Sequence, residues 1–406
     1  MTADLAYLPA KIDLGILPAP ARRLLDPKTP APLRQMAAKG ISPGLKPHES
    51  LAVIVLLANP AIILADAEAA GALGPADLEA AAATARATLE KLPTALLHGA
   101  LNPSLAPWVI DALVPLFSRD AAIMERILAL PQISLETVAH AATLASEAVA
   151  ELIATNEQKM LEHPAIIEAV YMNKATRMST ADRVLELAVR NKLELTGIPA
   201  YREAAAAIIN ELIAEPQPEP TFDDILYVET EEIAQIVTAK LDEVAKNGGV
   251  EDTHEVDEET GEEKIKEVVL PLHAQLAKMT VSQKIRRAML GSAGDRMLLV
   301  RDNNKLVAAA AIKSPSIQEN EVVRISSSRN VSDDVLRIIA NSGEWTHSHQ
   351  IKLNLVMNPR TPLVFSSRLI QHLREHELKA LAKSKNVTGA IQSAAKQILE
   401  RRVKKK

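Results

Sequence analysis

The last quarter of the chain repeats itself with a period of 28 residues. From Met297 onward the sequence divides without gaps into segments that begin at Met297, Ile325, Leu353 and Leu381. One aligned position then holds Asp302, Asn330, Asn358 and Asn386, and another holds Val307, Val335, Leu363 and Ile391. Since one short unit cannot bury its apolar face alone, a period of this size predicts an array of stacked repeats.

Each segment is typical of two helices joined by a polar corner. We expect Asp302, Asn330, Asn358 and Asn386 to be repeat-corner residues, because short side chains of this kind tolerate left-handed backbone angles and bond nearby peptide groups. The pattern places Ser332, Thr361 and Thr388 at helix N-caps, and Pro362 at a first helical position. It also predicts that the apolar columns, including Leu353 and Leu363, form the core.

The corner at residues 355–362, LVMNPRTP, resembles the Asn-Pro-x-Thr-Pro corner of HEAT-like α-solenoids of the leucine-rich-repeat-variant type. Other segments depart from it, with Val331 and Val387 in place of the first proline and Asp302 in place of asparagine. The resemblance covers about residues 297–400 and implies a fold, since such repeats host many unrelated functions. The expected fold class is therefore all-α, an α-solenoid of HEAT-like helical-hairpin repeats in two arrays joined by an acidic linker.

The composition favours packed helices over sandwiches or barrels. Hydrophobic residues make up 48% of the 406 residues, aromatic residues only 2%, and cysteine is absent. The absence of cysteine excludes disulfides, thiolate metal sites and a cysteine nucleophile. The apolar run 51–65 is shorter than the roughly 20 residues that span a bilayer and is broken at Asn59-Pro60, so it predicts a buried helix and corner. With no secretory signal at the N-terminus, we expect a soluble, cytoplasmic protein.

Composition shifts suggest four parts. They are a proline-rich arm at 1–48 with a short helix near 32–39, an N-terminal helical repeat array at 49–214, an acidic helix and mobile linker at 215–268, and a C-terminal helical repeat array with a basic tail at 269–406. The first array has irregularly spaced corners, including Asn102, Gln132 and His163.

Charge is unevenly distributed along the second half. Residues 215–267 hold 18 acidic and 4 basic residues, whereas 366–406 hold 3 acidic and 11 basic residues. The acidic part predicts a helix with an apolar stripe, followed by a mobile loop, with a small hairpin around Thr260-Gly261 as the alternative. The predicted stripe is Ile225, Leu226, Ile233, Ile236, Val237 and Leu241. Such a tethered acidic segment could cover the basic surface or merely solvate the chain.

Motifs for chemistry are sparse. No Gly-rich phosphate loop and no G-x-S-x-G elbow occurs. Residues 372–376, HLREH, match the inverted zinc-peptidase motif H-x-x-E-H, although solvated histidines fit as well. His-Glu pairs at His48, His254 and His376 are similar to the metal dyads of HEAT-repeat hydroxylases, but not at equivalent repeat positions. We therefore expect no enzyme activity, no catalytic residue, no cofactor and no metal.

Basic residues offer a stronger case for binding. The candidates for contact with a polyanion or protein partner are Arg286, Arg287, Arg296, Arg301, Arg324, Arg329, Lys352 and Arg360. On an array they would form a stripe that attracts phosphates or an acidic protein surface. The expected function is a non-enzymatic protein-interaction scaffold with a protein partner and no membrane. The alternative is a nucleic-acid-binding HEAT-like protein, similar to the repeat-built DNA glycosylases; the oligomeric state stays open.

Overall fold

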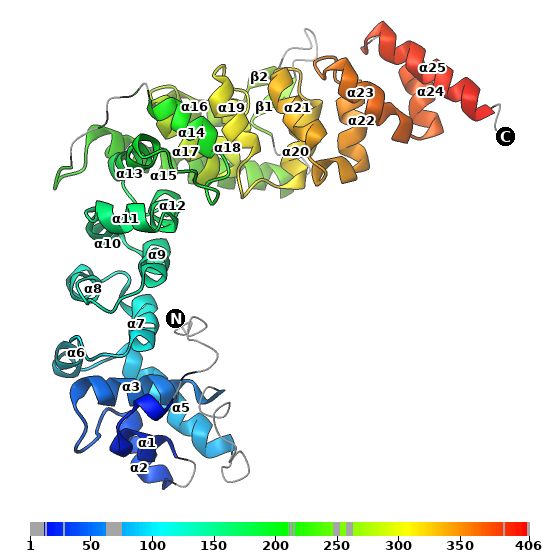
Figure 1. Cartoon of the computed structure of the whole chain (residues 1–406). Helices are drawn as coiled ribbons and strands as arrows, with labels where there is room; N and C mark the ends of the chain where they lie inside the picture. The colour runs from blue at the N-terminus through cyan, green and yellow to red at the C-terminus, as the bar shows by residue number, and fades with distance from the viewer. Residues whose placement is uncertain are drawn as a thin grey trace. The chain divides into compact units, whose positions relative to one another are not determined.

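The computed structural model describes residues 12, 14–26, 29–61, 75–209, 211, 213, 216–246, 252–256, 263–384 and 386–403. The chain is predominantly α-helical, which confirms the all-α prediction, and it divides into two compact units, Met1–Thr176 and Arg177–Lys406 (Figure 1). None of the helices in these described ranges is long and apolar enough to cross a membrane.

Unit 1 is built around helix α3 (Pro47–Ala58). Every residue from Ser50 to Ala58 is buried, because α2, α5 and α6 pack around the helix, and α3 ends at Asn59. The predicted buried helix is confirmed, whereas residues 62–65 of the same apolar run lie outside the described residues. The other elements are a 3₁₀ turn at Leu14–Ile16, α1 (Ala19–Leu25), α2 (Ala31–Ala38), α5 (Pro75–Glu90), α6 (Thr94–Ala100), α7 (Pro107–Phe117), α8 (Ala121–Leu128), α9 (Leu135–Leu144), α10 (Glu147–Ala154), α11 (Glu157–Glu162) and α12 (Ala165–Met172).

Unit 2 begins with helices that the sequence assigned to the first array. These are α13 (Met178–Arg190) and α14 (Tyr201–Ile208), and they pack on the later helices α15, α17 and α19. The two compact units meet between Thr176 and Arg177, and the described part of the acidic segment 215–268 lies within unit 2. That part consists of α15 (Phe222–Lys246), a hairpin and a 3₁₀ turn at Glu267–Val269.

The remaining helices of unit 2 form two rows, which are visible in Figure 1. From α17 to α22, each helix packs on the helix two places along the chain: α17 on α19, α18 on α20, α19 on α21 and α20 on α22. Helices α20, α21 and α24 are amphipathic and bury one face each, whereas α17 and α18 are buried almost throughout. Their bounds are α16 (Leu270–Leu276), α17 (Val281–Leu290), α18 (Ala293–Leu299), α19 (Lys305–Ile312), α20 (Glu319–Ser327), α21 (Asp333–Asn341), α22 (His349–Met357), α23 (Leu363–Leu369), α24 (Glu375–Lys383) and α25 (Gly389–Val403), with 3₁₀ turns at Trp345–His347 and Ile370–His372.

The apolar columns of the 28-residue pattern are mostly core. Met297, Ile325, Leu381, Val307, Val335 and Ile391 are all buried. The prediction is wrong for Leu363, which is 49% exposed at the first residue of α23, and Leu353 is only half-buried. In α22 the buried face is formed by Ile351, Leu355 and Val356, so Leu353 falls at its margin.

Side chains that reach back about one repeat occur in both units. The orphan carbonyls at a helix end need outside donors, and here the donors lie 27 to 32 residues later in the chain. In unit 1, Arg86 Nε bonds the Ala58 carbonyl at 3.0 Å and Asn173 Nδ2 bonds the Ala145 carbonyl at 2.8 Å. In unit 2, Arg402 Nη1 bonds the Leu373 carbonyl at 2.9 Å. Successive helical pairs are thus joined by recurrent side-chain bonds.

The acidic helix α15 is anchored inside unit 2. Asp224 accepts hydrogen bonds from the backbone and hydroxyl of Thr221, both at 2.8 Å, and from the backbone of Ser179 on α13 at 2.9 Å. Burial alone would raise the pKa of Asp224, but the bonds from Ser179 and Thr221 outweigh it and lower the pKa. The charged carboxylate therefore caps α15 and joins it to α13.

Candidate functional site

The basic residues of α17 lie in the interior. A capping box between Thr280 and Gln283 starts this helix, and α14, α18 and α19 surround it. Arg286 and Arg287 are fully buried, with their guanidinium carbons 5.3 and 5.4 Å from the ring centroid of the buried Tyr227 on α15. The prediction that these two arginines form part of a surface stripe is wrong, because neighbouring helices cover them.

Arg287 is held by two carboxylates. Its Nε and Nη2 bond the two oxygens of Asp295 at 3.0 and 3.1 Å, and both side chains are fully buried. Its Nη1 bonds Glu231 of α15. Such bidentate geometry is among the strongest forms of charge pairing. The arrangement joins α15, α17 and α18 and leaves Arg287 no capacity for an external phosphate.

Arg296 and Arg301 are also internal. Arg296 makes a bidentate pair with Glu321 at 2.9 and 2.8 Å and donates to the Gly291 carbonyl at 2.9 Å, so it connects α18 with α20. The side chain of Arg301 is 5% exposed and lies 3.5 Å from Asp252 and 3.6 Å from Glu263. Both acids belong to the segment that was expected to be a mobile linker.

The described part of that segment forms two paired strands, which agrees with the hairpin that was the alternative prediction. Strand β1 (His254–Val256) pairs antiparallel with β2 (Glu263–Ile265), whereas residues 247–251 and 257–262 lie outside the described residues. Glu263 accepts from Ser328 Oγ at 2.7 Å and from the Arg329 backbone at 2.8 Å. The acidic hairpin thus contacts the start of the next corner and covers Arg301.

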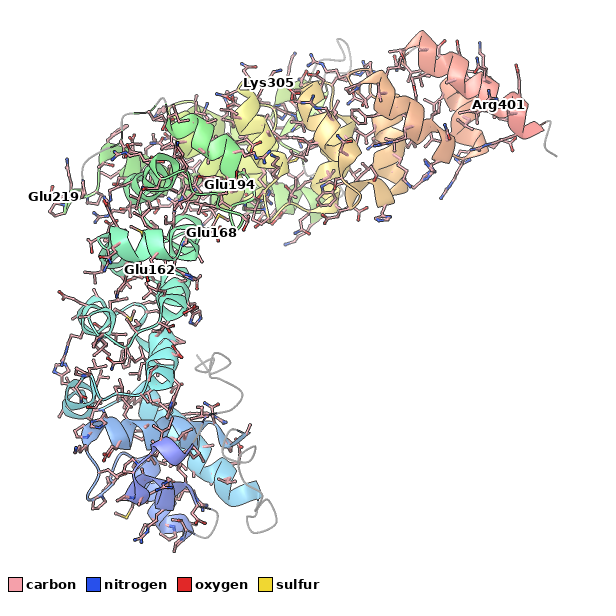
Figure 2. The ribbon with its side chains drawn as sticks, viewed as in Figure 1. Glu162, Glu168, Glu194, Glu219, Lys305 and Arg401 are labelled. Carbon is pink, nitrogen blue, oxygen red and sulfur yellow. The ribbon has the colours of Figure 1, made fainter. Side chains whose placement is uncertain are left out.

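The other four cationic candidates do not complete a stripe. Arg324 and Lys352 are half-buried, while Arg329 and Arg360 are exposed. Arg401 projects from the last turn of α25 in Figure 2, at the basic end of the chain. The structure therefore brings three of the eight predicted residues, Arg287, Arg296 and Arg301, into buried or covered ion pairs and buries Arg286 beside Tyr227. The sequence missed this because charge alone does not reveal burial.

The four corner residues differ in their roles. Asn358 is buried, and its amide donates to the carbonyls of Ser328 and Ser326 at 2.8 and 3.0 Å. Its backbone is extended, with φ −77° and ψ 117°, so the expected left-handed geometry is wrong. Asp302 accepts from Lys284 at 3.1 Å and from the Asn304 backbone at 2.7 Å. Asn330 and Asn386 are exposed.

The expected N-caps also differ. The Ser332 hydroxyl accepts from the Val335 backbone at 3.4 Å, which confirms it as a cap. Thr361 does not cap α23, because Pro362 occupies that position. The Oγ1 of Thr361 instead has no hydrogen-bond partner within the described part of the chain.

The outward face of α15 carries large apolar side chains. Phe222, Ile225, Val228 and Ile236 are exposed by 73%, 49%, 59% and 56%. The predicted stripe is therefore only partly right, since Leu226, Val237 and Leu241 are buried but Ile225 and Ile236 are not. The inward face also includes Tyr227, Thr230 and Ala234.

Acidic side chains share that outward face. Glu229, Glu232 and Glu243 are exposed, and Glu219 projects from the loop before α15 in Figure 2. Ile225, Val228, Glu232 and Ile236 follow the three- and four-residue spacing that places side chains on one side of a helix. The result is an acidic, aliphatic surface along a helix of 25 residues.

The histidine motifs do not converge. His372 ends a 3₁₀ turn, Leu373 is extended with ψ 154°, and α24 starts at Glu375, so His372 and His376 do not share one helix. His349 Nε2 instead lies 2.8 Å from Glu377. Across the residues that the structure describes, no group of three or more histidine, aspartate or glutamate side chains could hold a metal ion.

In comparisons with known proteins, no family model, no curated protein and no solved structure matches the chain.

Proposed function

We propose that the chain is an α-solenoid of HEAT-like helical hairpins that acts as a non-enzymatic protein-interaction scaffold. The repeat architecture is supported by side-chain hydrogen bonds that reach back about one sequence period. They recur along the chain, the first made by Arg86 and the last by Arg402. It is also supported by the two helix rows of unit 2. Such arrays present extended surfaces suited to partner binding.

The exposed face of α15 is the observation that carries the proposed function. Single exposed apolar residues are normal, but several on one helix face mark an interaction surface. Phe222, Ile225, Val228 and Ile236 lie on a helix that is firmly anchored through Asp224, so the surface is held in place without a partner.

The partner that fits this face is a basic amphipathic helix. Its apolar side chains would cover Ile225, Val228 and Ile236, and its lysines or arginines would face Glu229, Glu232 and Glu243. Nucleic acid fits less well, because α15 would repel phosphates and four of the eight candidate cations are buried or covered.

The proposal is tested with a synthetic amphipathic peptide that has leucines on one helical face and lysines on its flanks. Anisotropy titration of the full chain should give binding that weakens at least roughly tenfold, about 1.4 kcal/mol, in the double variant Ile225→Glu and Ile236→Glu. Val364→Glu is the matched control, since Val364 is 77% exposed on α23. A scrambled peptide of equal charge should bind weakly; equal binding of both peptides would refute helix recognition.

A further inference from the structure

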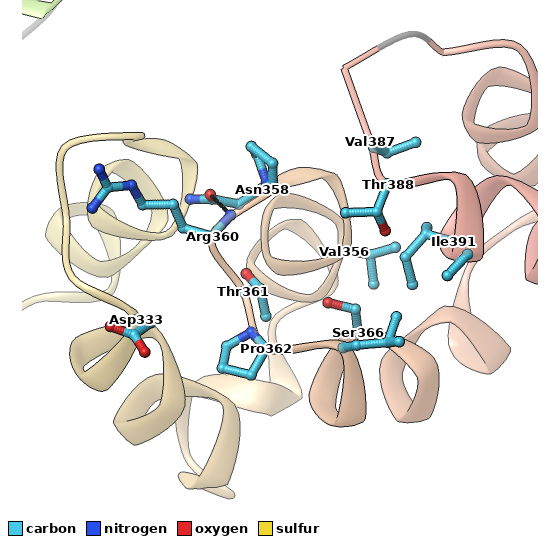
Figure 3. A pocket seen from close by; sticks show the side chains of 13 residues that line it. Asp333, Val356, Asn358, Arg360, Thr361, Pro362, Ser366, Val387, Thr388 and Ile391 are labelled. Carbon is cyan, nitrogen blue, oxygen red and sulfur yellow. Dashed lines mark hydrogen bonds between the residues drawn. The ribbon is translucent and has the colours of Figure 1, made fainter.

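A second candidate site lies far along the sequence from α15, at the C-terminal end of unit 2. A cavity of about 380 Å³ opens between the corner at residues 358–362 and the start of α25, and Figure 3 shows its lining side chains. Its volume falls in the range of about 300–1,000 Å³ that is usual for ligand pockets.

One end of the cavity is aliphatic. Val356, Val387 and Ile391 are 1%, 7% and 2% exposed and come from α22, the corner before α25 and α25 itself. The half-exposed Leu363 adds to this wall. Leu363 is the residue whose exposure departs from the repeat pattern. It lies at the cavity and not in the core.

The other end is charged. Arg360 and Asp333 both line the cavity, both are exposed, and Figure 3 shows them at the side opposite Val387 and Ile391. One cation and one anion do not favour a phosphate group, which needs converging positive charge. They suit the mixed polarity of a peptide.

Thr361 lies between these two ends in Figure 3. The residue is 7% exposed, yet its Oγ1 has no bonding partner in the described ranges. Burying a hydroxyl without a hydrogen-bond partner is unfavourable. Thr361 is one of the residues that line the cavity, and its hydroxyl keeps unused hydrogen-bonding capacity there.

The start of α25 provides further polar capacity. Thr388 and Ala390 line the cavity, and α25 is a helix of 15 residues. The first N–H groups of a helix lack intrahelical acceptors and favour a carbonyl or carboxylate oxygen.

We propose that this cavity binds a short extended peptide segment that carries one aliphatic side chain next to an acidic residue. The aliphatic side chain packs against Val356, Val387 and Ile391. A peptide carbonyl accepts from Thr361 Oγ1, and the acidic residue pairs with Arg360. The site is separate from the α15 face and does not depend on it.

The test uses a displayed library of random short peptides selected on the full-length protein. Ala390 is exposed and lines the cavity, so Ala390→Trp should fill it without disturbing the core. Selected peptides should share an aliphatic residue beside Asp or Glu and bind Ala390→Trp at least roughly tenfold more weakly, about 1.4 kcal/mol. Ser393→Trp, at an exposed position of the same helix outside the cavity, should bind as wild type.

Further variants separate the contributions. Thr361→Val keeps the shape of the side chain and removes the hydroxyl. Arg360→Glu reverses the charge, so it should weaken the binding of peptides that carry the acidic residue. The proposal would be overturned if no selected peptide bound wild type more tightly than Ala390→Trp. It would also be overturned if mixed-sequence RNA bound wild type and Ala390→Trp abolished that binding. The double variant Ile225→Glu and Ile236→Glu should retain peptide binding at the cavity, so failure of either site is distinguishable from failure of the other.

Discussion

Asn358 Nδ2 donates a hydrogen bond of 2.8 Å to the carbonyl of Ser328, 30 residues earlier in the chain. Asn173 in unit 1 makes the equivalent bond to Ala145, and each asparagine also accepts from the backbone two residues after it. A corner asparagine thus satisfies its own corner and the end of the preceding helical pair. This double role explains why asparagine occupies that repeat position.

Replacement of Asn358 by alanine should destabilise unit 2. Two buried carbonyls, of Ser326 and Ser328, would lose their donor, and an unsatisfied buried group costs about 1–3 kcal/mol. Urea unfolding followed by circular dichroism measures the loss. Asn386→Ala is the matched control at an exposed corner, and equal effects of the two substitutions would contradict the role assigned to Asn358.

Loss of Arg287 should be more severe. Arg287→Ala leaves Asp295 buried without its bidentate partner, and breaking a buried pair costs roughly 3–5 kcal/mol. Arg329→Ala removes an exposed arginine and should change the free energy of unfolding by less than about 0.5 kcal/mol. Comparable thermal melting shifts for the two variants would show that the buried ion pair is misassigned.

Asp182 should make stability depend on pH. Burial raises its pKa from 3.8 to about 7, although the hydrogen bond from Ser282 Oγ, 2.5 Å long, lowers it in part. Between about pH 4 and 7, Asp182 is protonated in the folded chain and ionised in the unfolded chain. The free energy of unfolding therefore falls as pH rises through that window.

Asp182→Asn should remove that dependence. The variant should match wild type near pH 4 and become progressively more stable than wild type up to about pH 7, by about 1.4 kcal/mol for each unit of pKa shift. Chemical unfolding across this range checks the difference, with the exposed Asp242→Asn as control. A constant difference at all pH values would rule out a perturbed Asp182.

His254 reports whether the hairpin covers Arg301. Burial and the nearby Arg301 guanidinium lower its pKa from 6.5 to about 4. In an NMR titration of histidine-labelled protein, His254 should stay neutral until about pH 4, and Arg301→Ala should move its pKa toward the ordinary value. As pH falls from about 6.5 to 4, His254 becomes protonated in the unfolded chain but stays neutral in the folded chain. The stability that neutral His254 contributes to the folded chain is therefore lost over this range. An ordinary pKa in wild type would indicate that the hairpin is not docked.

The repeat period located the corners and most of the core, because Met297, Ile325, Val307 and Val335 all had to be buried on short helices. It could not place Arg286 or Arg287, since a buried arginine differs from an exposed one only through partners such as Asp295 and Glu231. Nor could it locate the unit boundary.

The sequence of α15 also contained a signal that the prediction misread. Apolar residues occupy two sides of this helix, with Leu226, Val237 and Leu241 inside and Ile225, Val228 and Ile236 outside. Merging both sets into one stripe hid the outward face. Separating them by helical angle would have indicated a second apolar surface.

The proposed scaffold is tested most directly by photo-cross-linking at Val228. A photoreactive phenylalanine there, in the full chain expressed in its own cells, should cross-link a protein whose attached segment is a basic amphipathic helix, identified by mass spectrometry. Ile225→Glu and Ile236→Glu together should abolish the product, whereas the same probe at Val364 should not yield it. A product that persists in the double variant, or that forms equally from both positions, would contradict the assignment of α15 as the partner surface.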